Sequence, residues 1–287
     1  MLSLTRPEGP QGNIVRMLPA VAYPERIVCL TEETTETLYL LGEEWRIVGI
    51  SGFTVRPPRA RREKPRVSAF TSAKIDRIID LRPDLVLGFS DLQADIAAQL
   101  VRAGIEVHVF NHRSVAEILR TIAVLGGMIG CEAKTGQLLQ RLQEGLQGVQ
   151  QRAAALQHRP RVYFEEWDEP QISGIRWVSE LIGLAGGEDC FPELACQSLG
   201  RNRIIADGLE VPRRAPDIIL GSWCGKKFRP DAVAARAGWQ NVPAVRRGYV
   251  REIKSALILQ PGPAALTEGV QAIQQVICEW ATDTARL

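Results

Sequence analysis

A phrase that occurs twice, once in each half of the chain, constrains the fold more than any other feature. Pro83-Asp84 and Pro216-Asp217 are each followed by two aliphatic residues, then leucine and glycine, in RPDLVLGFS and APDIILGSW. Each phrase is typical of a helix end followed by a short buried strand. A chain of 287 residues is long enough for two lobes of about 130 to 150 residues. The repeat therefore predicts the same strand in two similarly built lobes.

Short apolar runs alternate with helical patterns around both copies of this repeated phrase. Strands are expected over residues 26–30, 46–51, 85–89, 106–110, 161–166, 217–222 and 248–253. Helices are expected from residue 32, over 73–81, 92–104, 114–130, 175–187, just before Pro216, and over 229–239 and 263–281. This alternation predicts an α/β fold with two doubly wound parallel-sheet lobes, each with helices on both faces of its sheet.

One long segment, residues 132–157, interrupts the alternation. Leu138, Leu142, Leu146 and Val149 recur at helical spacing within it, and the remaining positions are mostly polar. A helix of this length spans about 39 Å and suits a connector between lobes. We therefore expect four regions: an N-terminal extension (1–25), an N-terminal lobe (26–131), an interlobe helix (132–158) and a C-terminal lobe (159–287). A rigid connector of this kind predicts limited hinge motion.

Charge and composition restrict the classes of partner. The chain has 35 Lys and Arg against 33 Asp and Glu, a formal charge of +2, so nucleic acid is not an expected partner. Six cysteines form no CxxC pair. His108 and His112 are four residues apart, but His108 lies in an expected strand and not on a helix, so no metal site is predicted. No apolar run of 18 residues predicts a membrane span.

The first residues show no secretory signal, because no apolar run of 7 to 15 residues follows a basic start. As the sequence stands we expect a cytoplasmic protein. A periplasmic location is expected instead if an export signal has been removed.

Aromatic residues follow nearly every predicted strand, although they make up 6% of the chain. In open parallel sheets, ligands bind beyond the carboxyl ends of the strands, so rings gathered there predict a large, partly apolar ligand. The plain alternative is that the rings close the core at the sheet edge. Trp45 and Trp280 lie away from these positions and are predicted to be core residues. The rings at strand ends are Phe53, Phe70, Phe89, Trp167, Trp177 and Trp223.

Polar groups at the same strand ends leave a catalytic alternative open. Glu165, Glu166 and Asp168 follow one strand and are typical of a general acid and base, or of hydrogen-bond acceptors in a cleft. Cys224 follows another strand and is flanked by Lys226. No GxSxG, Walker or HExxH motif accompanies them.

Taken in order, these features resemble the substrate-binding proteins of ABC importers for metal chelates, in the class with a single helical backbone. The similarity rests on the two lobes, the long connecting helix, the PDLV-type strand in each lobe and the stretch GGEDCF (186–191), and it covers about residues 26–281. Family members bind vitamin B12, iron siderophores or haem. The sequence is most similar to the cobalamin-binding members.

The resemblance implies roles for particular residues. VGISGFTVRPP is similar to a segment that meets the corrin, and the strand ends in both lobes match positions where the relatives carry rings. An acidic residue on each lobe docks onto the permease in this family. The implied ligand-binding residues are Phe53, Phe70, Phe89, Glu166, Trp167 and Trp223, and the implied docking residues are Asp76 and either Asp207 or Glu210.

We therefore expect a monomeric, non-enzymatic protein that binds a cobalamin-like corrinoid between its lobes, for transport through an ABC permease or for handling inside the cell. No catalytic cofactor is expected. A ferric siderophore or haem is the alternative ligand, and an α/β enzyme with Glu166 or Asp168 as base is the alternative class. An anionic chelate would need cations at the strand ends, and haem would need His112 as axial ligand. The candidate cations are Arg61, Arg62, Lys226, Lys227 and Arg229.

Overall fold

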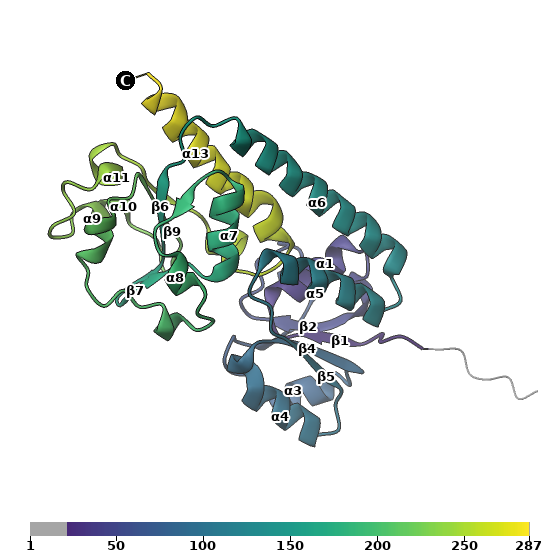
Figure 1. Cartoon of the computed structure of the whole chain (residues 1–287). Coiled ribbons are helices and arrows are strands. Elements are labelled where there is room, and N and C mark those ends of the chain that lie inside the picture. Colours follow the sequence, from purple (N-terminus) through teal and green to yellow (C-terminus); the bar gives the residue numbers. More distant parts are fainter. Residues whose placement is uncertain (1–21, 287) are drawn as a thin grey trace, which may run out of the picture.

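Two five-stranded sheets, one in each half of the chain, organise residues 22–286, the part that the computed structural model describes (Figure 1). In the first sheet the strand order is β3-β2-β1-β4-β5, and every neighbouring pair is parallel. Its strands are β1 (Ile27–Cys29), β2 (Ile47–Ser51), β3 (Arg66–Ser68), β4 (Leu85–Phe89) and β5 (Val107–Phe110).

Both faces of this first sheet are covered, as the residues of β1 show. Ile27 and Cys29 belong to one hydrophobic cluster, whereas Val28 belongs to the cluster on the opposite face. Side chains of a strand alternate between faces, so helices must pack on both. The helices of this lobe are α1 (Glu32–Leu40), α2 (Ala60–Glu63), α3 (Ile75–Asp80), α4 (Ala94–Arg102) and α5 (Val115–Met128), with short 3-10 turns η1 (Glu44–Arg46) and η2 (Asp91–Gln93).

The second sheet has the order β10-β9-β6-β7, and β8 pairs with the start of β6. It is formed by β6 (Arg161–Asp168), β7 (Gln171–Ser173), β8 (Glu188–Asp189), β9 (Ile218–Gly221) and β10 (Val250–Glu252). The helices of this half are α7 (Arg176–Leu184), α8 (Pro192–Ala195), η3 (Gly200–Asn202), α9 (Glu210–Arg214), α10 (Pro230–Ala234), α11 (Pro243–Arg246), α12 (Ser255–Ile258), η4 (Ala265–Gly269) and α13 (Val270–Thr284).

One pair in the second sheet departs from the predicted parallel arrangement. β7 runs antiparallel to β6, because two residues separate the strands and a parallel crossover needs a dozen or more. The remaining pairs are parallel. The predicted class, two doubly wound α/β lobes with a long helix between them, is confirmed with this one exception.

The connecting helix α6 (Glu132–Ala154) begins where the sequence predicts and ends three residues before the predicted end at 157. It buries the predicted apolar stripe, Leu138, Leu142, Leu146 and Val149. α13 lies beside α6 along its second half (Figure 1). Gln274 ties the two helices, because its Nε2 donates to Val149 O at 2.7 Å and its Oε1 accepts from Arg152 Nε at 2.6 Å. The predicted boundaries of the four regions stay a prediction.

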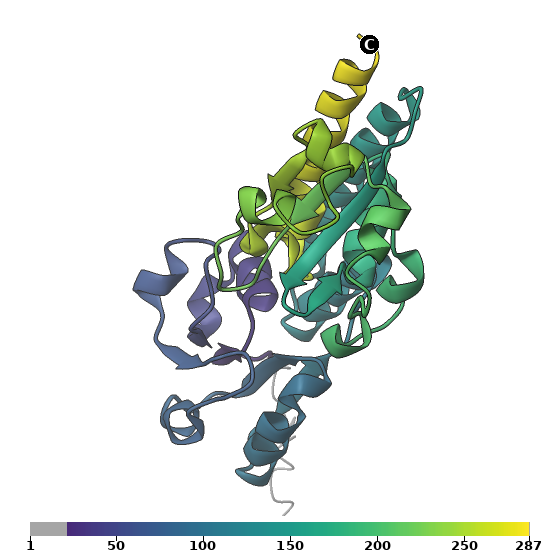
Figure 2. The same cartoon turned by 90° about the vertical axis from the view of Figure 1, so that its left-hand side faces the viewer.

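The segment before α13 reaches back onto the first lobe. Nε2 of His112 lies 2.7 Å from Pro261 O, and Ala264 N donates to Glu36 Oε2 at 3.1 Å. Arg56 binds both Glu36 and Glu268, the latter through two bonds of 2.7 and 3.0 Å. Figure 2 shows the lobes from the side, with this segment close to the first lobe. The lobes are therefore joined by direct contacts as well as by α6.

Some local predictions are corrected by the structure. Trp45 is not a core residue: it is 56% exposed in η1, where its Nε1 donates to Glu43 and the Arg46 guanidinium covers its ring. Trp280 is buried as predicted. The helix expected over 229–239 is limited to α10, and the sequence did not predict β3 or β7. In the described part of the chain, no helix is long and apolar enough to cross a bilayer.

Candidate functional site

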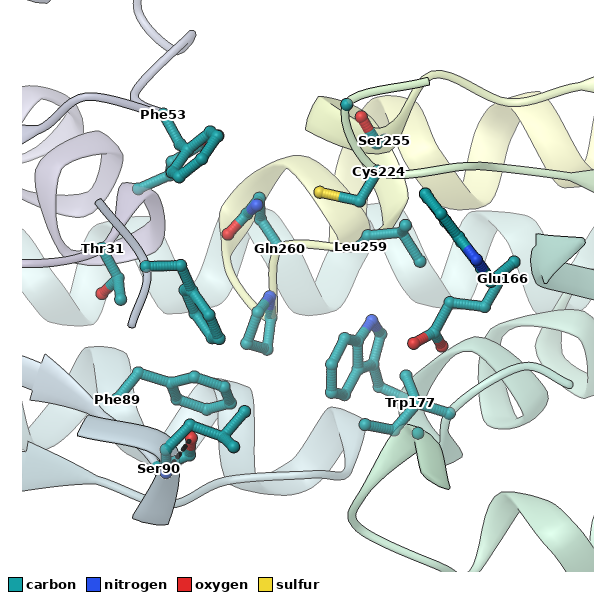
Figure 3. A pocket seen from close by; sticks show the side chains of 18 of the residues that line it. Thr31, Phe53, Phe89, Ser90, Glu166, Trp177, Cys224, Ser255, Leu259 and Gln260 are labelled. Atoms are coloured by element: carbon teal, nitrogen blue, oxygen red, sulfur yellow. Dashed lines mark hydrogen bonds between the residues drawn. The ribbon is translucent and has the colours of Figure 1, made fainter. Parts of the chain in front are cut away.

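A cavity of about 540 Å³ lies between the two lobes, beyond the carboxyl ends of their strands. The segments at the carboxyl ends of β1, β2, β3, β4 and β5 supply one wall. The opposite wall comes from β6, β7, α7, the loop around η3 and the loop after β9. The segment 255–261 forms the back, where Ser255, Leu259 and Gln260 approach the cavity (Figure 3). This is the position at which open α/β sheets bind ligands.

Five aromatic rings line the cavity, three from the first lobe and two from the second: Phe53, Phe70, Phe89, Trp167 and Trp177. Figure 3 shows Phe53 and Phe89 on one side and Trp177 facing them from the other. Phe53 is 50% exposed, whereas Phe89 and Trp177 are buried. A flat apolar molecule held between these walls would cover the exposed surface of Phe53 and contact Phe89 and Trp177 where they line the cavity.

A buried glutamine holds two of these rings in place. Gln93 Oε1 accepts from Phe89 N at 2.9 Å, and its Nε2 donates to Phe70 O at 2.9 Å. Between Phe89 and Gln93 the chain turns through Ser90, whose φ of 67° lies in the left-handed region and is costly for a residue other than glycine. The side chain of Gln93 therefore fixes the turn after β4 and the loop that carries Phe70.

The second wall is braced through tryptophan hydrogen bonds. Trp177 stands in the first turn of α7 and donates through Nε1 to Ile258 O at 2.8 Å. Trp167, near the end of β6, donates to Glu169 O at 3.0 Å. In both residues the indole N–H is satisfied by a backbone carbonyl oxygen, which fixes the orientation of a ring that lines the cavity.

Trp223, which the sequence predicts as a ligand-binding ring, does not line the cavity. It belongs to the loop after β9 and is buried there, with its ring 4.8 Å from that of Phe228 and its Nε1 donating to Glu165 Oε1 at 3.2 Å. The other predicted ligand residues, Phe53, Phe70, Phe89, Glu166 and Trp167, do line it. Their role in binding stays a prediction.

Glu165 and Glu166 point to different sides of β6. Glu165 is fully buried and is held by two bonds from Arg236, at 2.9 Å for the longer, so it belongs to the core of the lobe. Glu166 lines the cavity and pairs with both Nη atoms of Arg203 at 2.6 and 2.8 Å. Asp168 pairs with Lys226 at 2.6 Å. Each of these three carboxylates therefore forms an ion pair with a basic side chain.

Glu32 and Glu33, at the start of α1, form a buried acidic pair that the sequence analysis did not single out. Glu32 lines the cavity with 6% of its surface exposed, and its Oε2 has no hydrogen-bond partner among residues 22–286. Burial, reinforced by the carboxylates of Glu33 and Glu36, raises the pKa of Glu32 to about 8. Burial likewise raises the pKa of Glu33 to about 7, against a hydrogen bond from Thr31. Glu32 is therefore largely a neutral carboxylic acid at pH 7 and can both donate and accept.

Cys224 also lines the cavity, with its sulfur directed inward (Figure 3). Burial raises the pKa of this thiol, and the charges of Glu32 and Glu166 add to the effect. It is therefore a thiol and a weak nucleophile at neutral pH. In the part of the chain described by the structure, no group of three His, Cys, Asp or Glu side chains is placed to hold a metal ion.

None of the cations predicted for an anionic chelate lines the cavity. Arg61, Arg62, Lys226, Lys227 and Arg229 are exposed outside it. His112 is buried against Pro261, and burial lowers its pKa to about 4, so it is a neutral structural side chain. The cations that do line the cavity within residues 22–286 are Arg113 and Arg203. Neither arginine belongs to a sequence motif from which a role in the cavity could have been predicted.

The predicted docking residues lie on the two lobes. Asp76 is exposed in the first turn of α3. Asp207 is also exposed and pairs with Arg213 at 2.6 Å, and Glu210 pairs with Arg213 and Arg214. Their role in docking remains a prediction.

Two α/β lobes, a helical strut and an aromatic-walled cavity between the lobes define a two-lobed solute-binding protein. A family model described as periplasmic binding protein matches residues 27–257, and the chain belongs to this family. Such proteins bind solutes for ABC importers and are not enzymes, which excludes the catalytic alternative. The resemblance seen in the sequence is thereby confirmed.

Comparison with curated proteins gives distant relatives. An uncharacterized ABC transporter substrate-binding lipoprotein of Bacillus subtilis, YvrC, is 26% identical over 271 residues, covering 88% of this chain and 80% of the relative. A vitamin B12-binding protein of Vibrio parahaemolyticus is 23% identical over 261 residues, covering 89% of this chain and 88% of the relative.

Solved structures share the fold. The periplasmic vitamin B12 binding protein BtuF of Vibrio cholerae superposes with a TM-score of 0.74 at 21% identity, covering 91% of this chain and 99% of that one. The periplasmic haem-binding protein RhuT of Roseiflexus sp. RS-1 also superposes with a TM-score of 0.74 at 21% identity, covering 88% and 99%. The fold is therefore shared by proteins named for two different macrocycles.

Proposed function

We propose that this protein binds a cobalamin-like corrinoid in the cavity between its lobes. The observation that carries the proposal is the set of rings on opposite walls, Phe53, Phe70 and Phe89 against Trp167 and Trp177. A corrin is large, flat and partly apolar, so it can contact both walls at once. Glu32 and Gln260 offer hydrogen bonds to the amides at its edge.

The lining favours a corrinoid over haem. No histidine or tyrosine lines the cavity in the described part of the chain, and a typical haem site supplies one of these or a thiolate to the iron. Cys224 is held as a thiol. Cobalamin can carry its own lower axial base, so it needs no such ligand from the protein. The B12-binding name of one curated relative points the same way.

A siderophore is the weaker alternative because anionic chelates need convergent cations. Arg113 and Arg203 line the cavity, but Arg203 is already neutralised by Glu166. One free guanidinium does not match a ligand with several anionic groups.

We further propose that the loaded protein delivers its ligand to an ABC permease, with Asp76 on one lobe and Asp207 or Glu210 on the other as contacts. The exposed position of Asp76 and the family membership support this. Handling of a corrinoid inside the cell is the alternative use of the same site. The expectation of a cytoplasmic location rests on the N-terminal residues, of which 1–21 lie outside the described residues.

Calorimetric titration tests the ligand. We expect cyanocobalamin to bind with one-to-one stoichiometry and micromolar or tighter affinity, and haemin and a ferric catecholate to bind at least tenfold more weakly. A protein that binds haemin or the catecholate tightly and ignores cyanocobalamin would refute the proposal.

A further inference from the structure

Two arginines from different lobes line the same cavity. Arg113 lies between β5 and α5 in the first lobe, and Arg203 follows η3 in the second. Burial lowers the pKa of Arg113, the carboxylates of Asp91 and Glu117 oppose this shift, and the positive charge of Arg203 adds to it. Like charges brought together in a half-buried space have a cost unless an anion joins them.

Arg203 is held rigidly and is almost fully buried, with 2% of its side chain exposed. Both Nη atoms bind Glu166, and one of them also donates to Ser173 O. Its Nε has no partner among the described residues, although it is buried. An unused N–H on a charged and immobile group is a ready donor.

Arg113 is the cation at this cavity that lacks a close carboxylate. The carboxylate oxygen nearest to its guanidinium group is Oδ1 of Asp91, 3.6 Å from Nη2, and Asp91 is largely exposed. Its Nη1 donates to His112 O at 3.0 Å, and its guanidinium lies 4.7 Å from the centre of the Phe89 ring. Its side chain is 12% exposed, and within residues 22–286 its Nε is buried without a partner.

We propose that Arg113 and Arg203 form a subsite for one anionic group of the ligand, a phosphate or a carboxylate. Arg203 is paired with Glu166, whereas the guanidinium of Arg113 has only the largely exposed carboxylate of Asp91 nearby, whose charge solvent screens. The carboxylate of Glu117 binds the backbone N–H of Arg113 and not its guanidinium, so the guanidinium is available to an anionic group.

Arg113 lies over the Phe89 ring, so the subsite is next to the aromatic wall. The anionic group is therefore expected to be part of the same ligand that contacts the rings. The inference rests on the proposed function and deepens it, since cobalamin carries a single phosphodiester in its nucleotide loop.

Arg113 is the residue to change, because removing Arg203 would leave Glu166 without its partner. We would compare the wild type with Arg113→Gln, Arg113→Lys and the control Arg120→Gln, an exposed arginine of α5 outside the cavity. Each is titrated with cyanocobalamin and with cobinamide, which lacks the nucleotide and its phosphate.

Arg113→Gln is expected to weaken cyanocobalamin binding roughly 10- to 100-fold, the usual effect of losing a charge-assisted contact, and to change cobinamide binding less than about threefold. Arg113→Lys should recover part of the loss, and Arg120→Gln should change neither affinity. Equal weakening for both corrinoids, or no weakening for either, overturns the subsite and leaves the proposed function standing.

If the wild type binds neither corrinoid, the proposed function fails and the subsite is tested with haemin, which carries two carboxylates, against haemin dimethyl ester. A loss in Arg113→Gln confined to the free acid supports an anion subsite filled by carboxylate. Equal binding of acid and ester by both proteins, or no binding of either, overturns it.

Discussion

The ionisation of Glu32 is strongly coupled to folding. Its pKa rises from 4.5 to about 8 because folding buries it at the cavity beside Glu33 and Glu36. A carboxyl with a raised pKa stabilises the folded state below pH 4.5 relative to higher pH, and this contribution is lost as pH rises through 8. Glu32→Gln should therefore raise the free energy of unfolding at pH 8 by about 2 to 4 kcal/mol and leave it nearly unchanged at pH 4.5.

Urea unfolding at both pH values measures this difference. Glu144→Gln, on the exposed side of α6, is the matched control and should show little change at either pH. An equal effect of Glu32→Gln at both pH values would show that folding does not raise the pKa of this carboxyl.

Trp167 and Trp223 should behave differently, although the sequence assigns them the same role. Trp167 lines the cavity, so Trp167→Ala should weaken cyanocobalamin binding by about 1 to 3 kcal/mol with a modest loss of stability. Trp223 packs on Phe228 inside the lobe, so Trp223→Ala should lower the free energy of unfolding by about 3 to 5 kcal/mol. Titration and thermal unfolding of both variants separate the two effects. A reversed pattern would contradict the placement of the cavity wall.

At this scale the sequence predicted the rings better than the polar groups. Phe53, Phe89 and Trp167 lie at or just after the ends of predicted strands, so the strand prediction places them at the cavity. Phe70 follows β3, which the sequence did not predict, and the family resemblance indicated it. Arg203 was missed because it reaches the cavity from η3, which belongs to an irregular loop that no periodicity predicts.

Among the elements, α5 and α6 approach closely enough to exclude a side chain at one position. A Cβ at Gly126 would lie 1.9 Å from Oγ1 of Thr135, whereas a Cβ at Gly145, on the exposed side of α6, meets nothing within 4 Å. Gly126→Ala should therefore destabilise the protein by about 1 to 3 kcal/mol. Gly145→Ala should stabilise it by about 0.5 to 1 kcal/mol, because alanine has the higher helix propensity.

Chemical denaturation of the two variants checks this opposite sign. The same sign for both would mean that α5 and α6 do not pack as closely as the structure shows.

The sequence predicted the long and periodic elements and missed the short ones. α6 and the central strands carry strong patterns of apolar residues. β3 has three residues and lies at the end of a basic run, and β7 is a short return strand, so neither has a period long enough to detect. The antiparallel pairing of β7 depends on the two-residue connection to β6, which has no turn signal of its own apart from Pro170.

For the whole molecule, the contacts between lobes predict that ligand binding causes little rotation. α6 and α13 lie side by side, and Arg56, Glu36 and His112 join the first lobe to the segment 261–268. Small-angle X-ray scattering should give the same radius of gyration with and without cyanocobalamin, within the error of the measurement. A clear decrease on adding the ligand would indicate a domain closure that these contacts oppose.

The central claim is that a corrinoid occupies the cavity between the lobes. Crystals grown with cyanocobalamin and measured at the cobalt absorption edge test it directly, because the anomalous signal locates the cobalt without any assumption about the ligand's orientation. We predict one strong peak between the wall of Phe53 and Phe89 and the wall of Trp167 and Trp177. A peak elsewhere on the protein, or no peak at saturating ligand, would contradict the claim.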